Sequence, residues 1–203
     1  MPSSSACFDL LFITEELSLK LGTATAGEIH LFAYLGCLLS LFEGQPVADW
    51  GYSFAGLESG SPFSPDLQEA YAELERAGFV SSSDGAVTVT GLGKEQVGVF
   101  KGLKMFMPRK SYLSAACASL LSFPVGAVRN AMSMEPGLRP VFSAGGIRPL
   151  LAAASLEQLH EHFDALFNVL GKTSDLLVPS AVWLTYLLES SRKHDHDLVS
   201  RTS

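Results

Sequence analysis

The sequence has little charge and few cysteines. Only 17% of its 203 residues are charged, whereas 47% are apolar. The three cysteines, Cys7, Cys37 and Cys117, are odd in number and far apart, so they indicate neither a disulfide framework nor a CxxC metal pair. The first residues also lack the basic segment and apolar run of a secretory signal. We therefore expect buried thiols in a reducing, cytoplasmic setting.

One uncharged segment raises the question of a membrane. Residues 111–128 form a run of 18 residues without a charge, which is a borderline length for crossing a bilayer. The run contains four serines and an internal Phe123-Pro124 pair. A buried helix followed by a break is therefore favoured, and no membrane partner is expected.

The sequence also lacks a recognisable catalytic pattern. Segment 91–94 (Gly-Leu-Gly-Lys) does not have the spacing of a phosphate-binding loop, and no Gly-x-Ser-x-Gly elbow occurs. His160 and His162 lie two residues apart on an expected helix, so they point to opposite sides and cannot share a metal. His194 and His196 fall in an expected loose tail, which would give a metal little support. We predict a chain that is not an enzyme, with no catalytic residue, cofactor or metal.

Basic residues are scarce in the first half of the chain. Residues 1–93 carry 12 acidic side chains and two basic ones, Lys20 and Arg76, whereas residues 94–203 carry 9 acidic and 12 basic ones. The two parts therefore offer partners opposite electrostatic character.

What the chain does contain is a succession of helix and turn signals. Thr25 and Glu28 have the spacing of a capping box, and Ser64 followed by Pro65 is typical of a helix start. A Ser-Asp-Gly turn at 83–85 separates two short β-rich runs. The expected elements are helices over 8–21, 26–42, 65–77 and, capped by Thr90, 92–106, with a hairpin of 79–81 and 86–89.

Helix, helix, capped helix and hairpin is the order of a winged helix. The hairpin is then the wing, and 65–77 takes the place of a recognition helix. The predicted fold class is mostly α with a small β-hairpin: a winged-helix domain over 1–106, then a helical extension over 107–193. Ser155 begins a capping-box pattern within that extension. Residues 194–203 are expected to form a disordered tail.

Four short segments carry a family resemblance. They are 52–54 (Tyr-Ser-Phe), 60–67 (Gly-Ser-Pro-Phe-Ser-Pro-Asp-Leu), 74–80 (Leu-Glu-Arg-Ala-Gly-Phe-Val) and 89–93 (Val-Thr-Gly-Leu-Gly). In this order they resemble the winged-helix core of the Panacea and YwgA-like families, over residues 27–100 and with Ser61 inserted relative to the family pattern. The resemblance implies a setting among bacterial antitoxins or accessory subunits of defence systems, including three-component systems built around an ABC-type ATPase. Residues 111–193 resemble no family.

The charges argue against DNA as the ligand of helix 65–77. Duplex binding depends largely on lysine and arginine neutralising phosphates. This helix has four acids and one base: Asp66, Glu69, Glu73, Glu75 and Arg76. The turn at 81–84 adds no cation. A protein-docking role is therefore favoured over specific DNA reading.

One basic stretch is a candidate contact for nucleic acid or an acidic partner. It comprises Lys94, Lys101, Lys104, Arg109 and Lys110. Lys94, Lys101 and Lys104 are expected to share a helical face, because seven residues make about two turns. This stretch is either a solvated helix surface or the site of a non-specific, salt-sensitive DNA contact.

Apolar side chains are unusually abundant for one core. The mean hydropathy of +0.25 indicates a thick core or a surface that a partner covers. Most of these apolar side chains are expected in the core. On the last helix, Trp183, Tyr186 and Leu187 are also candidate interface residues, because aromatic side chains are favoured anchors. His30, on an apolar helix, is expected in the core or at an interface.

These patterns predict a non-catalytic winged-helix subunit of a larger bacterial protein assembly. The resemblance implies anti-phage defence and a large protein partner, an ABC-type ATPase or a nuclease. The alternative is a DNA-binding transcriptional regulator or antitoxin that uses the basic stretch.

Overall fold

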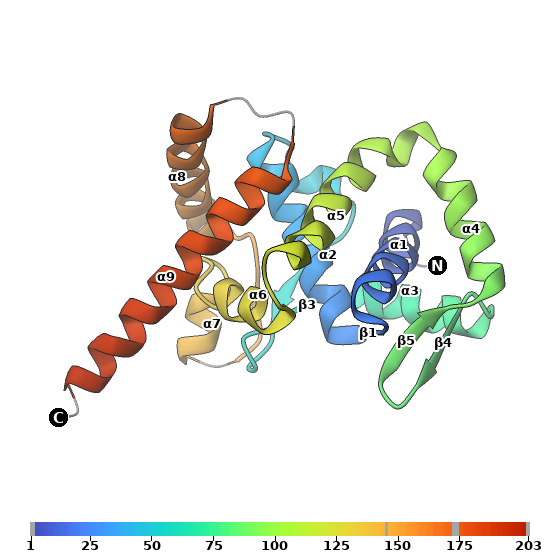
Figure 1. Cartoon of the computed structure of the whole chain (residues 1–203), viewed down its shortest axis with the longest axis horizontal. Coiled ribbons are helices and arrows are strands. Elements are labelled where there is room, and N and C mark those ends of the chain that lie inside the picture. The colour runs from blue at the N-terminus through green and yellow to red at the C-terminus, as the bar shows by residue number, and fades with distance from the viewer. Residues whose placement is uncertain (1–2, 145, 172–174, 202–203) are drawn as a thin grey trace. The chain divides into compact units, whose positions relative to one another are not determined.

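A computed structural model describes residues 3–144, 146–171 and 175–201, with the side chains of 142–144 and 193–201 outside the description (Figure 1). The chain is mostly helical, at 69%, with small sheets, which confirms the predicted class at this level. Its contacts divide it into two units. Unit 1 comprises Met1–Ala55 and Pro62–Cys117, and unit 2 comprises Gly56–Ser61 and Ala118–Ser203.

Unit 1 holds the elements expected of the first domain and one helix more. In chain order they are α1 (Ser4–Leu21), β1 (Ala24–Thr25), α2 (Ala26–Phe42), η1 (Val47–Trp50), β2 (Ala55–Gly56) at the boundary, β3 (Pro62–Phe63), α3 (Pro65–Arg76), β4 (Val80–Ser83), β5 (Ala86–Val89), α4 (Gly91–Gly102), η2 (Lys104–Phe106) and α5 (Met107–Ala118). The division expected after residue 106 therefore lies later, since α5 packs within unit 1 up to Cys117.

The helix starts follow the capping signals of the sequence. The Thr25 hydroxyl accepts from the Glu28 N–H, and the Glu28 carboxylate accepts from the Thr25 N–H at 2.8 Å, which completes the predicted capping box. Ser64 caps α3 and Pro65 occupies its first position. Local hydrogen bonding thus sets where α2 and α3 begin.

The hairpin forms as predicted and joins a three-stranded sheet. The strand order is β1-β5-β4, with both pairs antiparallel and Val80 opposite Val89. Asp84 and Gly85, with φ of 52° and 78°, form the two-residue turn that suits the twist of a hairpin. Figure 1 shows β4 and β5 leading from α3 into α4.

The centre of unit 1 is apolar on every side of α2. Every α2 residue from Ile29 to Leu41 is buried, which explains why this helix has no polar face in the sequence. Phe8 of α1 stacks on Phe106, with ring centroids 4.5 Å apart, so η2 is tied to the same core.

Gly93 allows α4 to approach the hairpin closely. A Cβ at this position would overlap the carbonyl oxygen of Phe79 and lie 2.7 Å from the Val89 side chain. Thr90 completes the junction, because its hydroxyl donates to the Gly78 carbonyl at 2.7 Å and accepts from the Gly93 N–H at 3.1 Å. The Thr-x-x-Gly after the hairpin is therefore a packing requirement of this corner.

We predict that Gly93→Ala lowers the free energy of unfolding by about 3 kcal/mol, because backbone must move to admit the methyl group. Gly98→Ala, in the same helix and with open space around it, should raise that energy by about 0.5 kcal/mol. Urea unfolding of both variants checks this. Equal effects of the two changes would contradict the packing argument.

Unit 2 contains short elements followed by two long helices. They are η3 (Ser119–Leu121), α6 (Val125–Met132), α7 (Arg139–Ala144), β6 (Arg148–Pro149), α8 (Ala153–Leu170) and α9 (Leu177–Arg201). The helical nature of this part agrees with the sequence analysis, but two of its details do not.

The capping box expected at Ser155 does not form. Helix α8 begins earlier, with Ala152 at the N-cap position, and the Ser155 hydroxyl donates back to the Ala152 carbonyl at 2.9 Å. A serine inside the first turn readily bonds the backbone in this way. The tail expected over 194–203 is helical as far as Arg201, and residues 202–203 lie outside the described part of the chain.

The described residues contain helices whose length and composition bear on the membrane question. None of their helices alone is long and apolar enough to cross a membrane, and the one pair that is, Lys104–Leu121 with Val125–Met132, is bent by 117° at its break.

Candidate functional site

Helix α3 and the hairpin present an acidic surface. Leu67, Ala70 and Leu74 are buried, so the other side of α3 faces solvent. The exposed or partly exposed charged side chains there are Asp66, Glu69, Glu73, Glu75 and Arg76. Arg76 pairs with Glu73 at 2.7 Å. The remaining carboxylates make this surface net negative.

Glu75 ties α3 to the hairpin. Its Oε1 accepts from the hydroxyls of Ser82, at 2.5 Å, and Tyr71, at 3.2 Å. Ser81, which precedes Ser82 on β4, shares a hydrogen bond with Thr88 on β5 at 3.0 Å between the two hydroxyls. The α3–hairpin surface is thus one hydrogen-bonded face of carboxylates and hydroxyls.

His30 of α2 holds the start of α3 through a hydrogen bond. The Ser64 N–H donates to His30 Nδ1 at 3.1 Å, and the imidazole lies 4.9 Å from the Phe63 ring, centroid to centroid. The His30 side chain is buried, and this burial lowers its pKa to about 4. The structure confirms the expected core position of His30. It also shows that His30 accepts the Ser64 N–H, which requires the imidazole to be neutral.

We predict a loss of stability on acidification that depends on His30. Between pH 6.5 and 4 the unfolded chain takes up a proton at His30 that the folded chain does not, so the free energy of unfolding falls as pH falls, by about 3 kcal/mol across the window. His30→Gln keeps an acceptor without this titration and should flatten the profile. Urea unfolding at pH 7, 5.5 and 4 measures it, and parallel profiles for both proteins would contradict it.

The predicted basic stretch does not form one surface. Lys101 pairs with Glu15 of α1 at 2.5 Å. Helix α4 ends at Gly102, so Lys104 lies in η2 and does not share the helical face of Lys94. Lys94, Lys104 and Lys110 are exposed, but Arg109 is buried. The inclusion of Arg109 as a surface contact is therefore wrong, because its charge is needed inside unit 1.

Arg109 is half of an internal ion pair. Its Nε and one terminal nitrogen donate to the two carboxylate oxygens of Asp9 at 2.5 and 2.6 Å, and the other terminal nitrogen donates to the Trp50 carbonyl at 2.7 Å. The guanidinium also lies 3.8 Å from the Trp50 ring centroid. Tyr52 donates its hydroxyl to the same carboxylate at 2.5 Å. Four residues from three segments thus form one network.

The environment of this network is strongly desolvated. Burial raises the pKa of the Asp9 carboxyl, although Arg109 and Tyr52 oppose that shift. Burial alone would lower the pKa of Arg109, but the Asp9 carboxylate holds it above its usual value. Arg109 therefore stays charged, and its two bonds to the Asp9 oxygens favour the carboxylate form against the burial that opposes it. One sequence signal could have revealed it, since Asp9 stands alone among apolar residues of α1.

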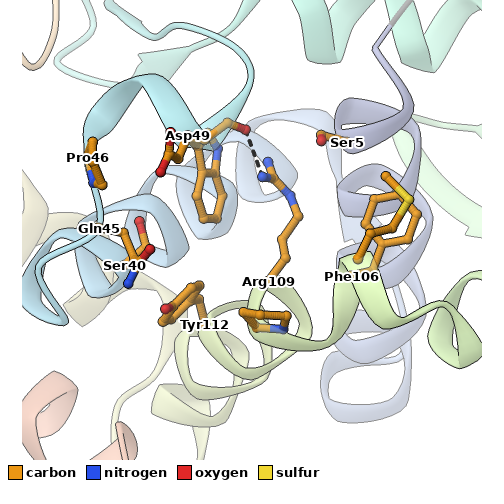
Figure 2. A pocket seen from close by; sticks show the side chains of 11 residues that line it. Ser5, Ser40, Gln45, Pro46, Asp49, Phe106, Arg109 and Tyr112 are labelled. Carbon is orange, nitrogen blue, oxygen red and sulfur yellow. Dashed lines mark hydrogen bonds between the residues drawn. The ribbon is translucent and has the colours of Figure 1, made fainter.

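A pocket of about 290 Å³ opens beside Arg109. Figure 2 shows Arg109 extending from α5 toward the segment that carries Asp49, with Tyr112 beside it on the side of Ser40 and with Ser5 of α1 on the other side. Arg109 is already ion-paired with Asp9, so its charge is not free to bind a ligand in this pocket. The bonds of Arg109 to Asp9 and to the Trp50 carbonyl suit a structural role.

We predict that Arg109→Met lowers the free energy of unfolding by about 4 kcal/mol, because it leaves the Asp9 carboxylate buried without its partner. The double variant Asp9→Leu/Arg109→Met removes both charges and should be clearly more stable than Arg109→Met alone. Denaturant unfolding of Arg109→Met, Asp9→Leu and the double variant gives the comparison. A double variant as unstable as the sum of its single changes would contradict a coupled pair.

Two of the three candidate interface residues of the last helix are in the core of unit 2. Trp183 and Leu187 are buried, at 2% and 1% exposure, whereas Tyr186 is 52% exposed. Trp183 contacts Phe163 of α8, with ring centroids 5.3 Å apart. The prediction that Trp183 and Leu187 are interface residues is therefore wrong. These two side chains face the helices that α9 packs on, and Tyr186 remains at the surface.

Among the described residues, no three His, Cys, Asp or Glu side chains form a cluster that could hold a metal. The side chains of His194 and His196 lie outside the described part. Cys37 and Cys117 are buried free thiols, and burial raises their pKa well above the usual value.

Comparison with known proteins gives no relative: no family model, curated protein or solved structure matches this chain.

Proposed function

We propose that unit 1 is a winged helix that docks onto another protein through α3 and the β4–β5 hairpin. The order α1, β1, α2, α3, β4, β5 and the sheet order β1-β5-β4 support the winged-helix assignment. In that assignment the hairpin is the wing, and α3 is the helix that DNA-binding members place in a groove.

The charge of the α3–hairpin surface carries the proposal. Four carboxylates and one arginine lie on α3, and the exposed wing residues Ser81 to Asp84 add another carboxylate. A polyanion approaching this surface would be repelled, since duplex binding requires cations against the phosphates. A basic protein surface is the complementary partner.

A DNA-binding regulator is the weaker alternative. Of the five residues of its basic stretch, Lys101 is paired with Glu15 and Arg109 with Asp9. The three exposed lysines lie on α4, η2 and α5, and none lies on α3 or the wing. The lysine positions favour protein docking, and the proposal is completed by the expectation from the sequence of a non-catalytic, cytoplasmic subunit of a larger bacterial assembly. The resemblance over residues 27–100 suggests a defence complex with an ABC-type ATPase or nuclease as its setting.

We predict that a photo-crosslinking residue at Ala72, which is exposed on α3, forms an adduct with one protein in the cells that encode the chain. Glu69→Lys/Glu75→Lys should abolish the adduct by reversing the charge of this surface. Glu58→Lys/Glu95→Lys changes the net charge equally at exposed positions elsewhere and should leave the adduct unchanged. Mass spectrometry of the adduct provides the readout.

Duplex DNA supplies the opposing measurement. At about 50 mM salt, anisotropy of a labelled duplex should show no binding by the unmodified chain in the micromolar range. Micromolar binding that weakens steeply with salt, or a crosslink from Ala72 to DNA, would overturn the proposal in favour of the regulator.

A further inference from the structure

Helices α8 and α9 of unit 2 enclose an apolar groove of about 300 Å³. Two sets of side chains at helical spacing form its sides: Ala165 and Val169 on α8, and Val182 and Tyr186 on α9. Trp183 lines the groove between them. Figure 1 shows these as the two long helices of unit 2.

The groove exposes apolar surface that the fold of unit 2 leaves uncovered. Val169 is 80% exposed, Tyr186 52% and Val182 39%. Isolated exposed apolar residues are ordinary, but a contiguous set lining a concave surface is typical of a binding site. The indole N–H of Trp183 and Nδ1 of His162, both from residues that line the groove, have no hydrogen-bond partner within the described part of the chain.

The acidic residues of α8 indicate what kind of partner would bind in the groove. Glu157, Glu161 and Asp164 follow one another at spacings of four and three, and α8 contains no lysine or arginine. Residues at such spacing form one stripe along a helix, and Glu161 itself lines the groove. A second copy of this chain would bring two acidic stripes together, so a basic partner fits better.

We propose that this groove binds an amphipathic helix of a partner protein, with the apolar face of that helix on Val169, Val182 and Tyr186 and its lysine and arginine flank along the acidic stripe of α8. This is the helix-in-groove mode of recognition, in which anchors recur every three or four residues. The site goes beyond the proposed function, which concerns α3 and the wing of unit 1, and it gives the subunit a second contact.

The test uses the full chain and two synthetic amphipathic helices of the length of α8, 18 residues. Both have leucine on one face; the other face carries lysine in the first peptide and glutamate in the second. Fluorescence anisotropy of the labelled peptides should show saturable binding of the lysine peptide, and binding of the glutamate peptide weaker by about tenfold or more.

Val169→Asp separates groove binding from general attraction to an acidic protein. The added carboxylate would strengthen general attraction to the lysine peptide, but it should weaken groove binding by about tenfold because a charge would be buried against leucine. The matched control is Val99→Asp, which makes the same change at a 60% exposed residue of α4 and should leave binding unchanged. Circular dichroism confirms that both variants fold.

Three results would overturn the proposal. They are equal binding of both peptides, unchanged binding by Val169→Asp, or a dimer in sedimentation that Val169→Asp dissociates, which would make a second copy the occupant. Glu69→Lys/Glu75→Lys on α3 should leave peptide binding intact. The experiments can therefore contradict the groove proposal without contradicting the α3–hairpin proposal, and the reverse.

Discussion

The carboxylate of Asp9 and the guanidinium of Arg109 meet in the interior of unit 1 although they are 100 residues apart in the sequence. Neither charge is stable there alone, because burial without a partner costs several kcal/mol. The pair therefore requires that α1, the end of η1 and the start of α5 come together in one alignment. The Trp50 carbonyl and the Tyr52 hydroxyl complete the same network, so the loop after α2 is fixed by it as well. The pair explains why α5 belongs to unit 1.

The α3–hairpin surface is held by hydrogen bonds of its own. His30 supports the start of α3 and Glu75 joins its end to Ser82. Because both ends are anchored, the carboxylates between them are presented at fixed positions instead of on a mobile loop. Fixed charges favour specific association with a complementary surface, and they steer the encounter before contact is made.

The sequence specified the elements whose signals are local. The starts of α2 and α3 follow from the caps of Thr25 and Ser64, which bond residues three positions on, and the hairpin turn follows from the positive φ angles of Asp84 and Gly85. The burial of Arg109 was not predictable in this way, because its partner Asp9 is 100 residues away and Lys110 beside it made a surface basic stretch the simpler interpretation. Spacing alone also misplaced Trp183, since a helix pattern does not tell which apolar side chains meet another helix. Charge composition, which needs no pairing information, indicated the acidic character of α3.

The short segment Gly56–Ser61 belongs to unit 2 although unit 1 surrounds it in the sequence. Gly56 lies so close to Val141 that a Cβ would be 2.8 Å from that side chain. The polypeptide therefore leaves unit 1, contributes to unit 2, and returns before finally entering unit 2 at Ala118. No single point in the sequence separates the two units, so neither unit is a continuous segment joined to one end of the other. The residues of unit 1 are all synthesised before Gly56 can meet its unit 2 neighbours beyond Ala118, such as Val141.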